Sequence, residues 1–288
     1  MTRKEALKSI AVGTAAVSLP GFAQSQPNNK SMEKLKGNIN HSACRWCYND
    51  IPLEALSEFA SDLGMKGIDL LKPEEWAVVQ KHGLTCSMAN PTNFSLTEGF
   101  NDPKNHASLQ KTYSELIPKV EEAGLTNLIC FSGNRNGISD KQGLELCAVG
   151  LEPLVKLAEK HQINLVMELL NSKVNHPDYQ CDHTPWGVAL CDKIGSDRFK
   201  LLYDIYHMQI MEGDVIATIQ KYHTYIVHYH TGGVPGRNEI DESQELYYPA
   251  IMKAILETGY KGFVAQEFVP SRGDDMASLK QGVMICDV

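Results

Sequence analysis

The sequence predicts an α/β protein that folds as a single (β/α)8 TIM barrel. Strand-like apolar runs alternate with helical patterns eight times. The segment that carries them, residues 37–288, is close to the ~250 residues typical of one such barrel. A doubly wound open sheet is the main alternative, but no Gly-x-Gly-x-x-Gly motif follows the first strand. No linker or change of composition marks a second domain.

The strands are predicted where short apolar runs are bounded by polar or turn residues. They are expected at residues 41–48, 67–71, 84–90, 127–132, 164–170, 199–206, 226–231 and 262–268. The helices are expected at residues 52–63, 74–81, 107–123, 140–161, 186–194, 215–225, 248–258 and 275–285. Start and stop residues support them: Pro52 opens the first helix, Gly64 ends it, Gly124 ends the third and Ser139 caps the fourth.

The first 23 residues are predicted to be a signal peptide that is cleaved. Arg3 and Lys4 give a basic start, residues 10–19 form an apolar run, and the segment ends in small residues at Ala23. The run is shorter than the ~20 residues that span a bilayer. Arg3-Lys4 is similar to a degenerate twin-arginine signal. We therefore expect an exported, periplasmic protein with a flexible leader at residues 24–36.

The net charge limits which partners the protein can bind, and its size indicates whether its cysteines must form disulfides. The net charge of -8 and the pI near 5.7 offer no basic surface for a nucleic-acid backbone. No later segment is apolar for long enough to cross a membrane. The chain is large enough to bury a core without disulfides, so Cys44, Cys47, Cys86 and Cys130 are expected as structural, buried thiols. The sequence leaves a monomer or a homo-oligomer open.

Four candidate metal ligands end four consecutive predicted strands, the fifth to the eighth. They are Glu168, Asp204, His230 and Glu267. Barrel active sites lie at the C-terminal ends of the strands, where such side chains converge. A lone glutamate at a strand end is more often a solvated rim residue, but clustered carboxylates repel one another unless a cation lies between them. Three carboxylates and an imidazole suit one divalent ion such as Mn, Mg, Co or Zn.

Three sequence segments carry a resemblance to a known family. Leu-Leu-Tyr-Asp-Ile-Tyr-His, Val-Pro-Gly-Arg-Asn-Glu and the Glu-Phe of the last strand resemble hydroxypyruvate isomerases, within the xylose-isomerase-like superfamily of sugar isomerases and epimerases. The resemblance runs from about residue 38 to the C-terminus. It implies that Glu168, Asp204, His230 and Glu267 bind the metal and that Glu168 and Glu267 are also the catalytic acid-base pair.

The resemblance also implies that His207 and Arg237 bind the substrate, and Asn171 is a further candidate. A guanidinium fork fits a carboxylate, such as that of hydroxypyruvate, through two hydrogen bonds. Structural roles are the alternatives. His207 could cap its strand, Arg237 could form a loop salt bridge with Glu239, and Asn171 could only turn the chain.

Moving a carbonyl to the adjacent carbon requires removal and return of a proton through a charged enediolate, which a divalent ion stabilises. We therefore expect an isomerase that interconverts an aldehyde and a ketone in a small sugar or hydroxy-keto acid. Hydroxypyruvate isomerases often carry glutamine at the position of His230, whereas ketose epimerases carry histidine. A ketose 3-epimerase, or a keto-sugar lyase or dehydratase, therefore stays open. The acidic charge argues against a nuclease, and the presence of both Glu168 and Glu267 argues against a catalytically idle sugar-binding protein.

Overall fold

The structure is a computed structural model that describes residues 34–288. Its strands are β1 (Asn40–Ala43), β2 (Gly67–Ile68), β3 (Thr85–Cys86), β4 (Asn127–Cys130), β5 (Asn164–Glu168), β6 (Phe199–Asp204), β7 (Ile226–Thr231) and β8 (Phe263–Gln266). Its α-helices are α1 (Leu53–Leu63), α2 (Trp76–Lys81), α3 (Pro103–Glu122), α4 (Asp140–His161), α5 (Thr184–Ile194), α6 (Ile205–Met211), α7 (Val215–Tyr222), α8 (Tyr248–Glu257) and α9 (Asp275–Cys286). Three short 3-10 helices, η1 (Arg45–Tyr48), η2 (Pro73–Glu75) and η3 (His223–Tyr225), complete the set.

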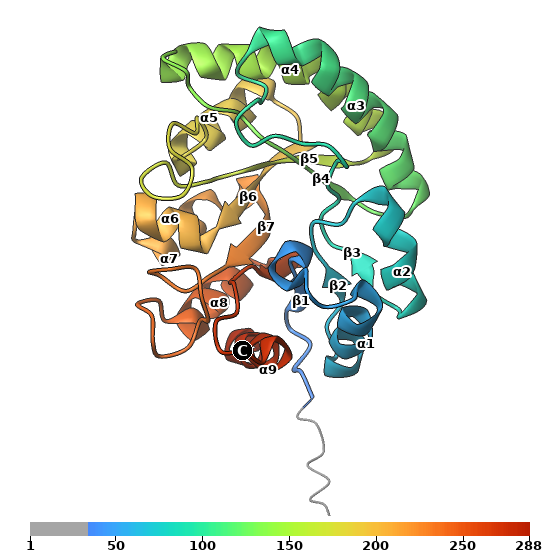
Figure 1. Ribbon diagram of the computed structural model, residues 1–288. Coiled ribbons are helices and arrows are strands. Elements are labelled where there is room, and N and C mark those ends of the chain that lie inside the picture. The colour runs from blue at the N-terminus through green and yellow to red at the C-terminus, as the bar shows by residue number, and fades with distance from the viewer. Residues whose placement is uncertain (1–33) are drawn as a thin grey trace, which may run out of the picture. The chain divides into compact units, whose positions relative to one another are not determined.

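The strands close into a ring, which confirms the predicted (β/α)8 TIM barrel. Six strands form one parallel sheet in the order β1-β8-β7-β6-β5-β4, and β2 pairs with β3 in parallel. Two single bridges complete the circle. Cys44, next to β1, bridges to Asp69, next to β2, and Ala89, after β3, bridges to Leu128 of β4. Figure 1 shows the strands in the centre with the helices outside them.

Local sequence explains where most elements begin and end. Strands of a parallel barrel are covered on both faces and are therefore apolar along their length, as in β4, where all four residues are buried. Helix α1 ends at Gly64, whose φ of 92° is left-handed. Ser139 caps α4 in a reciprocal pair with Gln142. The predicted start and stop residues of these two helices are thus confirmed.

Seven of the eight predicted strands run past the ends of the observed strands, and two of these errors fall beside the site described below. The strand expected at residues 41–48 ends at Ala43, and η1 follows it. The strand expected at residues 199–206 ends at Asp204, where α6 begins at once and the Asp204 side chain caps it by accepting from the His207 backbone N–H at 3.2 Å. Apolar runs cross both boundaries, so periodicity alone did not reveal where the chain turns.

The predicted signal peptide, residues 1–23, and most of the predicted leader lie outside the described residues. The last three leader residues belong to the barrel unit instead, which begins at Lys34. The Lys36 backbone N–H donates to Asp287 Oδ2 at 2.7 Å, and its Nζ donates to the Asp287 carbonyl at 2.9 Å. Among residues 34–288, no helix has both the length and the apolar character that a membrane crossing requires. All eight cysteines are buried and free, which confirms the expectation for Cys86 and Cys130.

Candidate active site

The structure brings the four predicted metal ligands together at the C-terminal ends of the strands. Glu168 ends β5, Asp204 ends β6, His230 lies in β7 and Glu267 follows β8. One ligand atom from each lies within 4.8 Å of those of the other three. All four side chains are buried, with Glu168 the most exposed at 4%. A barrel places the ends of consecutive parallel strands on one rim, which is why residues so distant in sequence converge.

Carboxyl groups outnumber cationic side chains in this cluster. Burial raises the pKa of Glu168, and it raises the pKa of Asp204 well above its usual value. Burial opposes ionisation of Glu267 as well, but the charges of Arg237 and His230 outweigh it and hold the pKa of Glu267 well below its usual range. Three carboxyl groups therefore share two cationic partners. In water-free surroundings such a set is stable only if protons or a further cation balance it.

The donor set fits a divalent ion. His230 Nδ1 lies 2.7 Å from Glu267 Oε2 and 3.3 Å from Glu168 Oε1. Apart from that 3.3 Å ion-pair contact with His230, Glu168 Oε1 is buried and has no hydrogen-bond partner in residues 34–288. A buried carboxylate oxygen without a donor is costly unless another group binds it. Oxygen atoms and one imidazole nitrogen around one point are the ligands that Mn, Mg, Co and Zn accept.

Arg237 approaches the cluster from the loop after β7. Its Nη2 donates to Glu267 Oε2 at 2.6 Å and to Asp204 Oδ2 at 3.2 Å. The guanidinium lies between two rings, with its central carbon 5.1 Å from the centre of the Trp46 ring and 5.3 Å from that of Tyr206. Trp46 also donates its indole N–H to Glu267 Oε1 at 2.8 Å. Arg237 is thus held over the carboxylates by stacking and by ion pairs.

The alternative of a loop salt bridge between Arg237 and Glu239 is wrong. The Glu239 carboxylate instead accepts from the Ser271 backbone N–H at 2.9 Å, the Ser271 hydroxyl at 2.7 Å and the Ser278 hydroxyl at 2.8 Å. These contacts join the loop after β7 to the loop after β8 and to α9. The adjacent Asp241 pairs with Arg272 across the same two loops.

His207 and Asn171 form a buried pair beside Asp204. Asn171 donates to His207 Nδ1 from its backbone N–H at 3.1 Å, and its side-chain nitrogen lies 2.6 Å from the same atom. The Asn171 oxygen accepts from the backbone N–H groups of Val174 and Asn175. Burial, followed by the charge of Arg237, lowers the pKa of His207 well below its usual value, so its ring is neutral. The structure thus places Asn171 in a turn that orients His207, and substrate contact by either residue stays a prediction.

Asp69 is part of this arrangement, although sequence reasoning did not single it out. Its Oδ2 lies 2.8 Å from His230 Nε2, and its Oδ1 lies 3.1 Å from His228 Nε2. Ser87 donates its hydroxyl to Oδ1 at 2.5 Å. His228, which is fully buried, takes part in this network. The signal that could have found Asp69 is a charged residue inside the apolar strand run of residues 67–71, because a buried charge requires partners.

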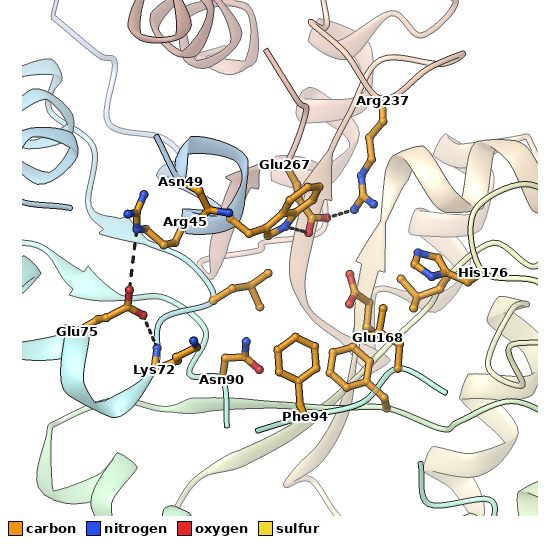
Figure 2. Close-up of a pocket in the computed structure, with 15 residues that line it drawn as sticks. Arg45, Asn49, Lys72, Glu75, Asn90, Phe94, Glu168, His176, Arg237 and Glu267 are labelled. Carbon is orange, nitrogen blue, oxygen red and sulfur yellow. Dashed lines mark hydrogen bonds and ion pairs between the residues drawn. The ribbon is translucent and has the colours of Figure 1, made fainter. Parts of the chain in front are cut away.

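A cavity of about 480 Å³ opens from the cluster. Glu168, Arg237 and Glu267 line it, together with Trp46 and His176. Figure 2 shows Arg237, Glu267 and Glu168 facing one space, with Arg45 and Glu75 at its far side. The His176 ring lies 5.2 Å from that of His207. Nothing in the sequence near Trp46 or His176 indicated this position, because Trp46 fell in a predicted strand and His176 in an unassigned loop.

Comparisons with known proteins agree with this geometry. A family model described as xylose isomerase-like TIM barrel matches residues 57–284. A Homo sapiens protein provisionally named hydroxypyruvate isomerase is 33% identical over 240 residues, which are 81% of this chain and 80% of that protein. The 2-oxo-tetronate isomerase of Cupriavidus necator is 32% identical over 77% of this chain and 88% of its own. The crystal structure of an AP endonuclease, family 2, from Brucella melitensis superposes with a TM-score of 0.75 at 24% identity, over 84% of this chain and 97% of that one. This last likeness shows the fold alone.

Proposed function

Since this chain belongs to the xylose isomerase-like TIM-barrel family, we propose that it is a metal-dependent isomerase that interconverts an aldehyde and a ketone, with hydroxypyruvate or a similar hydroxy-keto acid as substrate. The observation that carries the proposal is the convergence of Glu168, Asp204, His230 and Glu267 beside a cavity that two of them, Glu168 and Glu267, line. The names of the relatives that match over most of the chain, a hydroxypyruvate isomerase and a 2-oxo-tetronate isomerase, support the reaction class.

The four ligands would hold one divalent ion, Mn, Mg, Co or Zn. When bound, such an ion would act as a Lewis acid that stabilises negative charge on the substrate oxygens. The proton transfers are carried out by side chains of the protein. Glu168 and Glu267 come from β5 and from the end of β8, on either side of Asp204 and His230 in the strand order. One can remove the proton next to the carbonyl while the other returns a proton to the neighbouring carbon.

Arg237 would bind the substrate carboxylate. Its guanidinium lines the cavity and is held by the rings of Trp46 and Tyr206. A planar fork of N–H donors matches a carboxylate with two parallel hydrogen bonds. The apolar rings exclude water around that ion pair and so strengthen it.

The acid-base assignment is tested with Glu168→Gln and Glu267→Gln. Each glutamine keeps the shape and an oxygen but cannot accept a proton, so turnover should fall about 10²-fold or more while metal still binds. Isomerisation in heavy water should place deuterium on the carbon next to the carbonyl. Asp182→Asn, at a buried aspartate paired with Arg135 outside the cluster, is the control and should keep wild-type turnover. Near-normal turnover in both glutamine variants would contradict the assignment.

A ketose 3-epimerase is the second candidate, and the presence of His230 at a position where ketose epimerases carry histidine favours it. Both reactions begin with proton removal next to a carbonyl. They differ in where the proton returns, because an epimerase inverts one carbon and leaves the carbonyl in place. Product analysis by NMR separates them: a shifted carbonyl supports the isomerase, and an inverted carbinol carbon supports the epimerase.

A further inference from the structure

The cavity has two chemically different walls. Glu168, Arg237 and Glu267 form the polar wall described above. Five apolar side chains also line the cavity, and we call them the apolar wall: Leu70, Phe94, Leu96, Phe131 and Leu170. Polar residues such as Lys72 and Asn90 border them. Figure 2 shows Phe94 on the side of the cavity away from Arg237 and Glu267. The proposed reaction uses only the polar wall, and the apolar wall therefore calls for its own explanation.

The cavity is larger than a three-carbon acid requires. Its volume is about 480 Å³, within the range of roughly 300–1,000 Å³ found for sites that hold drug-sized ligands. A water molecule, which has a single non-hydrogen atom, occupies ~30 Å³ in the liquid. Even if each non-hydrogen atom of hydroxypyruvate occupied that volume, the molecule would fill less than half of the cavity. Every carbon of hydroxypyruvate also carries oxygen, so it offers no apolar group to the apolar wall.

The backbone of Leu70 is strained, so a leucine at this position of the apolar wall costs conformational energy. Its φ is 56°, in the left-handed region that costs a leucine about 1–2 kcal/mol and costs glycine almost nothing. The neighbours fix this conformation: the Asp69 backbone N–H donates to the Ala43 carbonyl at 2.8 Å, and the Asn90 N–H donates to the Leu71 carbonyl at 2.9 Å. Strain of this kind clusters at functional sites. Position 70 nevertheless carries leucine rather than glycine, and the leucine side chain lines the cavity.

Phe94 offers an open aromatic face in the same wall. It stacks on Phe131 with ring centres 5.5 Å apart and planes inclined by 24°. Phe131 is 6% exposed, whereas Phe94 is 46% exposed. The inner ring thus supports the outer one, whose free surface can bury a hydrocarbon chain or the C–H face of a sugar.

We propose that Leu70, Phe94 and Phe131 form an apolar subsite that binds the part of the substrate beyond the reacting carbons. The substrate is then a hydroxy-keto acid or keto sugar of more than three carbons, with a carbon chain or a ring face that packs on this wall. For a 3-hydroxy-2-oxo acid of this length the same carbonyl shift yields a second ketone, and only the three-carbon acid yields an aldehyde. This inference rests on the proposed function for the position of the reacting carbons.

A homologous series of ligands tests the subsite without turnover. Glycolate, lactate, 2-hydroxybutyrate, 2-hydroxyvalerate and 2-hydroxyhexanoate keep the hydroxyl and carboxylate constant while the chain lengthens. Their affinities for the full-length protein are measured by calorimetry with Mn²⁺ present. Burial of one methylene stabilises by ≈0.8 kcal/mol, which is about fourfold in affinity. We expect about a fourfold gain per methylene, and equal affinities along the series would overturn the subsite.

Three variants locate the effect. Leu70→Asn tolerates the left-handed backbone but presents an amide, and Phe94→Ser removes an exposed ring that the fold does not need. Each should reduce the gain to less than twofold per methylene. Val149→Ser changes an equally apolar but exposed residue on α4, outside the cavity, and should keep the wild-type gain. A full gain in both Leu70→Asn and Phe94→Ser would also overturn the subsite.

Turnover of 3-hydroxy-2-oxo acids of three to six carbons separates this inference from the proposed function. We expect kcat/KM to rise from hydroxypyruvate to the six-carbon acid. If hydroxypyruvate is isomerised as well as the longer acids, and binding does not depend on chain length, the subsite is wrong and the isomerase stands. If affinity rises with chain length but no acid is isomerised, the subsite stands and the proposed reaction is wrong.

Discussion

Asp69 controls which nitrogen of His230 faces the carboxylates. His230 Nε2 donates to the Asp69 carboxylate, which also receives hydrogen bonds from His228 and Ser87. The hydrogen bonds and charges of the two histidines outweigh burial and lower the pKa of Asp69. Because Asp69 holds Nε2, Nδ1 is the ring nitrogen that faces Glu168 and Glu267, and its lone pair would bind the ion once Nδ1 has lost its proton. A metal-binding imidazole needs this arrangement.

Asp69→Asn should therefore weaken metal binding rather than the reaction alone. An amide offers one acceptor oxygen and places an N–H₂ group among donors, so the orientation of His230 is lost. Loss of such a supporting contact typically costs about 10- to 100-fold in metal affinity, measurable by titration with Mn²⁺ followed by electron paramagnetic resonance. Asp182→Asn is the matched control. Equal Mn²⁺ affinity in wild type and Asp69→Asn would show that Asp69 does not position His230.

Arg237→Lys should raise KM for a keto acid about tenfold or more and leave kcat less affected. An ammonium cannot form the two parallel hydrogen bonds of a guanidinium. Lysine and arginine tolerate the φ of 59° at this position equally well, so the backbone does not confound the comparison. Arg45→Lys changes another arginine that lines the cavity and should alter KM less. An unchanged KM in Arg237→Lys would indicate a neutral sugar as substrate.

At the scale of elements, the loop after β7 is fixed to the loop after β8 through Glu239. Burial opposes ionisation, but hydrogen bonds from Ser271 and Ser278 lower the pKa of Glu239 to about 2. A carboxyl group whose folded pKa lies below its unfolded value stabilises the fold at pH values above the unfolded pKa. That stabilisation is lost as the pH falls from about 4.5 toward 2.

Glu239→Gln should remove this pH dependence. The difference in unfolding free energy between wild type and variant should shrink by about 2–3 kcal/mol across that window, as measured by urea denaturation at several pH values. Glu242→Gln changes an exposed glutamate of the same loop and should leave the wild-type pH profile in place. A difference that stays constant with pH would mean that Glu239 does not stabilise the fold through its charge.

Elements with short-range signals were predictable, and those that end through tertiary contacts were not. Ser139 and Gln142 satisfy each other within one turn, so the sequence contains the complete cap of α4. The end of β1 depends on other strands: the Cys44 N–H donates to the Gln266 carbonyl, and the Arg45 N–H donates to the Asp69 carbonyl. The chain leaves the sheet where these partners end. Local periodicity carries no record of that point.

At the scale of the whole molecule, β2 helps to close the barrel. This strand pairs with β3 and is joined to β1 through the bridge between Cys44 and Asp69. A Cβ on Gly67 would lie 2.8 Å from the Thr85 carbonyl oxygen and 3.3 Å from the Phe263 ring. The Thr85 backbone cannot move away from this added Cβ unless strand β3 moves with it.

Gly67→Ala should therefore destabilise the entire barrel. Overpacking of this kind typically costs about 1–3 kcal/mol, and because a single domain unfolds cooperatively, the loss should appear as a lower urea midpoint for the whole transition. Val149→Ala, at an exposed site on α4, should change the midpoint little. A urea midpoint for Gly67→Ala within the error of the wild-type value would show that β2 can shift to accept the added Cβ without loss of stability.

The sequence by itself determined the barrel and the convergence of Glu168, Asp204, His230 and Glu267. Strand and helix patterns are local, and consecutive parallel strands bring their ends to one rim whatever loops connect them. Only the tertiary structure decided what surrounds those residues. Trp46 donates to Glu267 across 221 positions of sequence, and the shape of the cavity depends on loops from many parts of the chain. Such contacts result from packing between distant segments, for which no local pattern exists.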